Sequence, residues 1–406
     1  MKKSNSSLRV TYAKAVHDEK EEAAVIKVLR EHRTILGQET KKFEEGVAKE
    51  FGKKFGIMTN SGSSANLLAV ELLSLPKGSE VITPMLTFST TVAPLIMKGL
   101  IPVFIDVVPQ TYQIDVSKVE KAITKKTKAL FIPNLLGNIP DMAALSRIAK
   151  KYKLFYIEDS CDTLGATFNG KPTGVYSDIS TTSFYGSHII TAGGGGGMLM
   201  VNKETWRDRA KVLRGWGRGS ASLNESEDLD LRFATKIGKM PYDAKFIFGE
   251  IGYNFLPIEM GAAFGNVQLQ KLPRFRRSRE RNYARLSKFF AKYTDYFALP
   301  IQDSKVITQW LSFPLTIKKS APFTRLDIVT YLEQHNIQTR PIFTGVITKQ
   351  PGFKSIKHRN GQRSFPASEE IMERGFVVGV HHGMEPEHLK KLEETITEFV
   401  TRFPKE

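Results

Sequence analysis

The chain has 406 residues with a formal net charge of +17, and 41% of its residues are hydrophobic. This length suits a large domain plus a smaller one, with enough apolar residues for a sizeable core. The single cysteine, Cys161, excludes an intramolecular disulfide framework and an all-cysteine iron–sulfur cluster within one chain. The positive charge suits phosphorylated small substrates as well as nucleic acid, but the basic residues are spread along the chain without a nucleic-acid recognition motif.

The N-terminal residues 1–7 lack the apolar stretch of a signal peptide, and no apolar run approaches the ~20 residues of a membrane span. We therefore expect a cytoplasmic protein with neither a membrane nor nucleic acid as its partner. No metal site is expected.

Residues 18–52 carry apolar side chains at helical spacing, which predicts an N-terminal helical segment. Short apolar runs then alternate with helix-like segments. The runs are 55–58, 81–83, 103–105, 129–132, 155–157, 180–184 and 198–201, and the helices are expected at 64–74, 117–124 and 142–151. This alternation predicts an α/β fold, with a mostly parallel sheet covered by helices on both faces.

Residues 218–245 are polar and aperiodic, and we interpret them as a long loop. A basic helical stretch from Leu272 to about Tyr293 then leads to a smaller C-terminal α+β domain. The strands of this domain are expected at 312–317 and 337–342, and its helices near 325–334 and 387–402. We predict a large domain over residues 1–270 and a linker helix with the small domain over 271–406.

Polar and aromatic residues follow several predicted strands. In the run 59–66, Gly62 lets the backbone approach an anion, and Ser63 with the helix-start amides can bind phosphate. An ordinary N-capped helix explains this run better when it is considered alone. Asp159 ends a very apolar strand, where a carboxylate can keep a pyridine nitrogen protonated, although a cap or salt bridge explains it equally well. Phe88 can stack on a flat ring, but core packing is the commoner role.

The run 183–191 contains Ser183, a further phosphate-binding hydroxyl, and His188, and it leads into five glycines, Gly193–Gly197. Histidine can move protons near neutral pH. Taken alone, such a histidine is more often structural, and such a glycine run is often a flexible hairpin.

Together and in this order, these motifs resemble the sugar aminotransferases that act on nucleotide-linked keto-sugars. That family has the aspartate-aminotransferase (type I) fold. The resemblance covers nearly the whole chain and includes residues 165–171, 252–254, 268–272, 340–345 and 376–381.

The family's usual pattern has a lysine five residues after Ser183, where this chain has His188. The lysine binds the cofactor as a Schiff base, which histidine cannot form. The exchange resembles the 3-dehydratase branch, which acts on GDP- or CDP-linked 4-keto-6-deoxyhexoses to make the 3,6-dideoxysugars of lipopolysaccharide O-antigens. The CDP type holds a [2Fe–2S] cluster on cysteines in a loop that residues 214–223 resemble, but this chain has no cysteine there. The mechanism without a cluster therefore remains.

The resemblance implies pyridoxamine or pyridoxal 5'-phosphate as cofactor, glutamate as amino donor, and a homodimer with a shared active site. His188 is the implied proton carrier, Asp159 the partner of the ring nitrogen, and Asp162 the partner of the phenolic oxygen. The implied cofactor-binding residues are Gly62, Ser63, Phe88, Asp159, Asp162, Ser183 and, from the neighbouring subunit, Asn254. Arg340 and His381 are weaker candidates for contacts with sugar or glutamate.

Three alternatives stay open at this point. The first is an aminotransferase that uses another lysine, of which Lys171 and Lys203 are the nearest downstream. The second is a non-catalytic relative, since Gly193 and Leu256 depart from the family pattern. The third is a basic nucleic-acid binder. The nucleotide, whether GDP, CDP or dTDP, and the sugar stereochemistry are left open as well.

Overall fold

The computed structural model describes residues 8–223 and 228–403. Residues 1–7, on which the signal-peptide expectation rests, lie outside these ranges, as do 224–227 and 404–406. No helix in the described ranges is long and apolar enough to cross a membrane.

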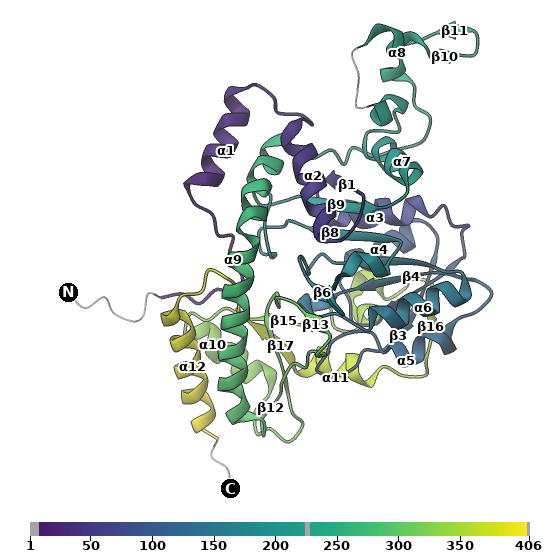
Figure 1. Cartoon of the computed structure of the whole chain (residues 1–406). Coiled ribbons are helices and arrows are strands. Elements are labelled where there is room, and N and C mark those ends of the chain that lie inside the picture. The colour runs from purple at the N-terminus through teal and green to yellow at the C-terminus, as the bar shows by residue number, and fades with distance from the viewer. Residues whose placement is uncertain (1–7, 224–227, 404–406) are drawn as a thin grey trace.

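A mostly parallel sheet forms the centre of the molecule (Figure 1). Over the described residues its strand order is β1-β9-β8-β5-β4-β2-β3-β16. The strands are β1 (Phe55–Thr59), β2 (Glu80–Pro84), β3 (Ile101–Ile105), β4 (Thr127–Pro133), β5 (Phe155–Asp159), β8 (Ile179–Ser183), β9 (Gly197–Val201) and β16 (Arg359–Asn360). β9 runs antiparallel to both β1 and β8, and the other neighbours pair in parallel. Each predicted apolar run is a strand of this sheet, so the predicted α/β class is confirmed.

Helices cover both faces of the sheet, because successive side chains of a strand point to opposite faces. In β1, Ile57 belongs to a core cluster with Leu68 of α3 (Gly62–Leu72), whereas Met58 belongs to one with Phe43 of α2 (Gln38–Glu50). The other helices of this part are α4 (Ser89–Met97), α5 (Val116–Val119), α6 (Met142–Tyr152) and α7 (Glu204–Arg214), with 3-10 turns η2 (Glu120–Ala122), η3 (Leu135–Gly137) and η4 (Thr173–Tyr176).

The predicted helical segment 18–52 is two helices, α1 (Glu19–Arg30) and α2, rather than one. α1 ends before His32, whose φ of 55° is left-handed. α2 follows Gly37, at a point where the buried Glu259 carboxylate accepts backbone N–H groups of its first turn. A carboxylate satisfies the unpaired donors of a helix start. The break at residues 31–37 therefore depends on a residue that is distant in sequence.

Residues 218–245 are not the plain loop that we expected. They carry short elements that apolar periodicity cannot reveal: η5 (Gly219–Leu223), α8 (Leu229–Phe233), β10 (Lys236–Ile237), β11 (Met240–Pro241) and η6 (Ala244–Phe246). Local turn chemistry forms them, since Asp228 caps α8 and Gly238 takes a φ of 62° between the two short strands. We call residues 228–251 the arm. α8, β10 and β11 project away from the body of the molecule (Figure 1).

Helix α9 (Glu259–Phe290) is longer than the predicted stretch and passes through the expected domain boundary at residue 270. It packs against α1 and α2 and, further along, against α12. The second sheet has the antiparallel order β12-β14-β17-β15. Its strands are β12 (Phe297–Ala298), β14 (Phe313–Ile317), β15 (Arg340–Pro341) and β17 (Gly375–Val378), and its helices are α10 (Arg325–Gln334), α11 (Pro366–Arg374) and α12 (Pro386–Thr401).

The predicted strand 337–342 is reduced to β15, because Pro341 lacks a backbone donor for a longer ladder. The remaining short elements are β6 (Thr167–Phe168), β7 (Lys171–Pro172), β13 (Val306–Ile307), η7 (Ala291–Tyr293), η8 (Ile347–Lys349) and η9 (Pro351–Phe353). Strand β16 comes from the C-terminal part of the chain but pairs with β3 of the large sheet. The division at residue 270 stays a prediction.

Candidate active site

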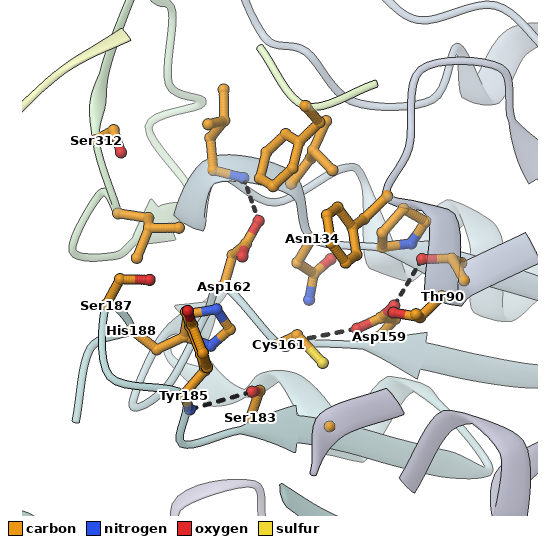
Figure 2. A pocket seen from close by; sticks show the side chains of 18 of the residues that line it. Thr90, Asn134, Asp159, Cys161, Asp162, Ser183, Tyr185, Ser187, His188 and Ser312 are labelled. Carbon is orange, nitrogen blue, oxygen red and sulfur yellow. Dashed lines mark hydrogen bonds between the residues drawn. The ribbon is translucent and has the colours of Figure 1, made fainter. Parts of the chain in front are cut away.

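A cavity of about 490 Å³ lies at the carboxyl ends of β5 and β8, next to the N-terminus of α3 (Figure 2). Ligands of open α/β sheets bind at this edge. The part of the chain after α9 contributes Leu311, Ser312, Arg340, Phe343 and Val377 to the wall. The cavity therefore lies between the central sheet and the C-terminal part.

The start of α3 forms one end of the cavity. Ser61 caps the helix by accepting the N–H of Ser64, and the residues that follow it, Gly62 and Ser63, line the cavity. The first backbone N–H groups of a helix have no acceptor inside the helix and attract anions. A Cβ at Gly62 would lie 2.6 Å from the Cβ of Ser183, so glycine brings that serine against the helix start. Gly62, Ser63 and Ser183 thus lie together at one end of the cavity, which we call the anion-binding end for the chemistry that it can support.

Asp159 lies at the end of β5, where the sequence places it, and it is buried. Its Oδ2 accepts hydrogen bonds from Asn66 Nδ2 at 2.9 Å and from Thr91 Oγ1 at 2.8 Å, and its Oδ1 accepts the Cys161 backbone N–H at 3.1 Å. All three donors are neutral, so none of them compensates a carboxylate charge. The carboxylate can therefore interact with a positively charged group of a ligand in the cavity.

His188 follows β8 and lines the same cavity. In the view of Figure 2, Cys161 lies between His188 and Asp159. The Nδ1 atom of His188 is buried without a hydrogen-bond partner in the described residues. Burial lowers the pKa of His188 to about 4, since a desolvated imidazolium is unfavourable. The imidazole is therefore neutral at neutral pH and can accept a proton.

Asp162 lines the cavity near His188 and accepts the backbone N–H of Leu136 at 3.0 Å. Burial raises the pKa of Asp162 to about 7, and the charge of Asp159 adds to this shift. At neutral pH a large fraction of this carboxyl group therefore keeps its proton, so it can donate a hydrogen bond to a ligand.

Phe88 and Arg340 also line the cavity, as predicted from the sequence for ligand contacts. Phe88 is 48% exposed and meets Phe343 edge-on, which leaves ring surface accessible for stacking. The Arg340 guanidinium lies over the ring of Tyr12, 5.0 Å from its centroid. Tyr12 in turn donates to Ser187 Oγ at 3.4 Å, beside His188.

Two predicted residues lie outside the cavity. Asn254 is exposed near the base of the arm, paired through its backbone with Gly215. His381 is buried, and its Nε2 lies 3.1 Å from both the hydroxyl and the carbonyl oxygen of Thr11. Burial lowers the pKa of His381 to about 3. The structure thus brings the predicted residues together except for Asn254 and His381.

The sequence matches the DegT/DnrJ/EryC1/StrS aminotransferase family over residues 15–397. The chain belongs to this family. It is 36% identical over 399 residues to a dTDP-4-dehydro-2,6-dideoxy-D-glucose 3-dehydratase of Saccharopolyspora spinosa, covering 96% of this chain and 86% of that protein. It is 33% identical over 390 residues to a GDP-4-keto-6-deoxy-D-mannose 3-dehydratase of Yersinia pseudotuberculosis, covering 94% and 96%. A solved structure, the E. coli GDP-4-keto-6-deoxy-D-mannose-3-dehydratase with bound hydrated PLP, matches with a TM-score of 0.84 at 30% identity, over 96% of this chain and 100% of that one.

These relatives confirm the resemblance to the family and to its 3-dehydratase branch, together with the predicted type I fold. The cavity fits the family's pyridoxal-type cofactor on its own geometry. A Cβ at Gly62 would clash with Ser183 and with the Sγ of Cys161, so the start of α3 leaves no room for a side chain at this position. The buried Asp159 carboxylate, which also lines the cavity, suits a protonated ring nitrogen. The unpartnered Nδ1 of His188 adds a free proton acceptor.

Two buried residues outside the predicted set support the Asp159 side chain. Asn66 and Thr91 are fully buried and fix the Asp159 carboxylate. Asn66 is detectable in principle, because it is a polar residue on an otherwise apolar stretch of α3. Thr91 has no such signal, since a threonine in a helix is common on either face.

Proposed function

We propose that this chain is a pyridoxamine/pyridoxal 5'-phosphate-dependent 3-dehydratase of a nucleotide-linked 4-keto-6-deoxyhexose. The observation that carries the proposal is His188, which lines the cavity at the family's lysine position. None of the cavity-lining residues that the structure describes is a lysine. The relatives named as 3-dehydratases support this reaction over amino transfer. Glutamate is the proposed amino donor. With one cysteine, the chain cannot hold an all-cysteine iron–sulfur cluster, so the proposed reaction proceeds without one.

Different residues of the cavity are proposed to bind different parts of the cofactor. When bound, the cofactor ring supplies an electron sink for loss of the sugar hydroxyl. Asp159 is the proposed partner of the ring nitrogen, and Gly62, Ser63 and Ser183 the proposed phosphate ligands. Without a lysine, these non-covalent contacts carry the whole of cofactor affinity.

His188 is the proposed proton carrier. Because burial lowers its pKa to about 4, the imidazole is free to accept a proton at neutral pH. The same burial makes the imidazolium a good proton donor, so one side chain can act first as base and then as acid toward the leaving hydroxyl. Asp162 is the proposed partner of the ring's phenolic oxygen.

We further propose that the enzyme is a homodimer whose partner supplies Asn254 to the site. Asn254 is exposed and lies outside the cavity of its own chain. The adjacent arm exposes several large apolar side chains, a feature of protein interfaces. They include Leu229, Phe233, Ile237, Met240, Phe246, Phe248 and Ile251, the last 97% exposed.

The test incubates the protein with pyridoxamine phosphate, glutamate and GDP-, CDP- and dTDP-linked 4-keto-6-deoxyhexoses, with mass spectrometry as the readout. We expect one or more substrates to lose the 3-hydroxyl with release of ammonia. His188→Asn should lower that rate roughly 10²- to 10⁴-fold, the usual contribution of general acid–base catalysis.

The matched control is His32→Asn, an exposed histidine whose left-handed backbone accommodates asparagine. It should leave turnover unchanged. Borohydride reduction of the pyridoxal-loaded protein should leave the cofactor dissociable. A cofactor fixed to the chain together with an aminosugar product would establish amino transfer instead, and unchanged turnover in His188→Asn would refute the role of His188.

A further inference from the structure

We propose that Arg279 is the positioning residue of His188. From α9 it contacts the backbone carbonyl of His188 and links the loop of this histidine to residues 310–311 and to His382. The inference rests on the proposed role of His188 as proton carrier. Arg279 does not touch the cavity and acts only through the loop that carries the histidine.

The contacts of Arg279 join three segments at one point. Its Nη1 donates to the carbonyl oxygens of Trp310 and Leu311, each at 3.1 Å. Its Nη2 makes a long contact of 3.5 Å with the carbonyl oxygen of His188, and its Nε donates to His382 Nδ1 at 3.3 Å. A guanidinium has five N–H donors in a fixed fork, so it can hold several backbone groups in one geometry.

The Arg279 side chain is 1% exposed, and among the described residues no carboxylate contributes to its pKa, which burial alone lowers. Its described partners are all neutral acceptors. Charge in a desolvated site acts over a longer distance than in water. The uncompensated cation therefore lowers the pKa of His188 further, in addition to the effect of burial.

Helix α9 holds the histidine loop at a second point. Gln268 Oε1 accepts the Thr191 backbone N–H at 3.5 Å, while its Nε2 donates to Glu21 Oε1 at 2.7 Å. Gln268 and Arg279 are separated by about three helical turns, so they lie on the same side of α9. The loop runs into Gly193–Gly197, which give it little stiffness of its own. One rigid helix therefore sets the position of His188.

Other charged or titratable groups also face His188, and any pH effect must be separated from theirs. They are Asp159, Asp162 and Cys161 from the end of β5, Tyr185 from its own loop, Tyr12 from the N-terminal segment, and Arg340 from the C-terminal part. Asp159 favours the charged imidazole, whereas Arg279 opposes it. Variants at Arg279 leave these groups in place, but they also change the surroundings of His381 and His382, whose pKa values are lowered by burial and by the Arg279 charge. The His188 signal must therefore be followed by itself.

The experiment compares Arg279→Met, which removes the charge, with Arg279→Lys, which keeps the charge but lacks the planar set of guanidinium N–H donors. Arg277→Met is the matched control, because Arg277 is exposed on the same helix. The first readout is a ¹³C-histidine NMR titration of the cofactor-free protein, with the His188 signal assigned from His188→Asn. The second is the pH dependence of kcat and KM for the substrate identified above.

We expect Arg279→Met to raise the titration midpoint of His188, as loss of a nearby like charge does. The acid limb of kcat should move to higher pH by the same amount. Arg279→Lys should keep the midpoint but lower kcat at least ~10-fold with little change in KM, because a misplaced base costs rate rather than binding. Arg277→Met should match the wild type in both readouts.

An unchanged midpoint in Arg279→Met together with an unchanged kcat in Arg279→Lys would overturn the inference. If Arg279→Met does not fold, Arg279→Lys decides: full activity with a lowered melting temperature would leave Arg279 a purely structural residue. The titration needs no substrate. A failure of the proposed dehydration is therefore distinguishable from a failure of this inference.

Discussion

At the scale of single residues, burial moves two side chains of the cavity in opposite directions. It lowers the pKa of His188 to about 4 and raises that of Asp162 to about 7. In both cases the neutral form gains, because low-dielectric surroundings penalise charge. The result is a neutral base beside a partly protonated acid. Asp159, by contrast, accepts three hydrogen bonds, from Asn66, Thr91 and the Cys161 backbone.

The raised pKa of Asp162 makes the free energy of unfolding depend on pH. The unfolded chain releases this proton near the usual value of 3.8, and the folded protein keeps it to about pH 7. The folded state binds more protons between these values, so this side chain lowers the free energy of unfolding as pH rises, by about 1.4 kcal/mol per pH unit at most. Asp162→Asn removes the titration and can still accept the Leu136 N–H.

Asp162→Asn should therefore gain stability over the wild type as pH rises from about 4 to 7, and the gain should level off above that range. Urea unfolding of the cofactor-free protein at pH 5 and pH 8 measures it. Glu387→Gln, at an exposed carboxylate, is the control and should show no such trend. If the free energies of unfolding of Asp162→Asn and the wild type differ by the same amount at both pH values, the raised pKa of Asp162 is contradicted.

At the scale of elements, local patterns predict the central sheet but not the parts held by distant residues. Short apolar runs separated by helical segments were sufficient for β1 to β9 of the large sheet. The break between α1 and α2 was missed because Glu259 caps α2 from far along the chain. The elements of the arm were missed because they are short and mostly exposed.

The same distinction applies to the site. Asp159 and His188 follow predicted strands and Ser183 lies near the end of one, so their position at one edge of a parallel sheet follows from the topology. Asn66 and Arg279 act from helices whose packing cannot be read from spacing alone. Sequence reasoning therefore finds the residues that face a ligand more readily than those that hold them.

The helix start at Gly62 offers a test at this scale. Gly62→Ala would place a Cβ 2.6 Å from Ser183 Cβ and 2.9 Å from Cys161 Sγ, so the anion-binding end must open. We expect the affinity for pyridoxamine phosphate to fall more than ~10-fold, which corresponds to about 1.4 kcal/mol. Equilibrium dialysis with absorbance detection measures it. Gly352→Ala, where no atom lies within 4 Å of the new Cβ, should bind normally. Equal affinities would remove Gly62 from the phosphate site.

At the scale of the whole molecule, we propose two separate functional surfaces in one chain. One is the cavity with His188, and the other is the exposed surface of Asn254 and the arm. In the proposed homodimer, two-fold symmetry makes the contribution reciprocal, so each subunit supplies its Asn254 to the cavity of the other. This arrangement predicts the activity of a mixed dimer in which each subunit carries a different inactivating substitution.

Mixing two inactive variants tests this arrangement directly. His188→Asn loses the proton carrier, and Asn254→Ala loses the proposed contact to the neighbour's phosphate. In a mixed dimer, one site carries both changes and the other carries neither, so an equal mixture reassembled from separated subunits should recover about a quarter of wild-type activity. The readout is the dehydration rate after mixing, with each variant alone and a mixture of His188→Asn with itself as controls. A mixture that gives only the mean of the two variants would mean that both residues serve the same subunit's site, or that the dimer does not form, and sedimentation velocity separates these two outcomes.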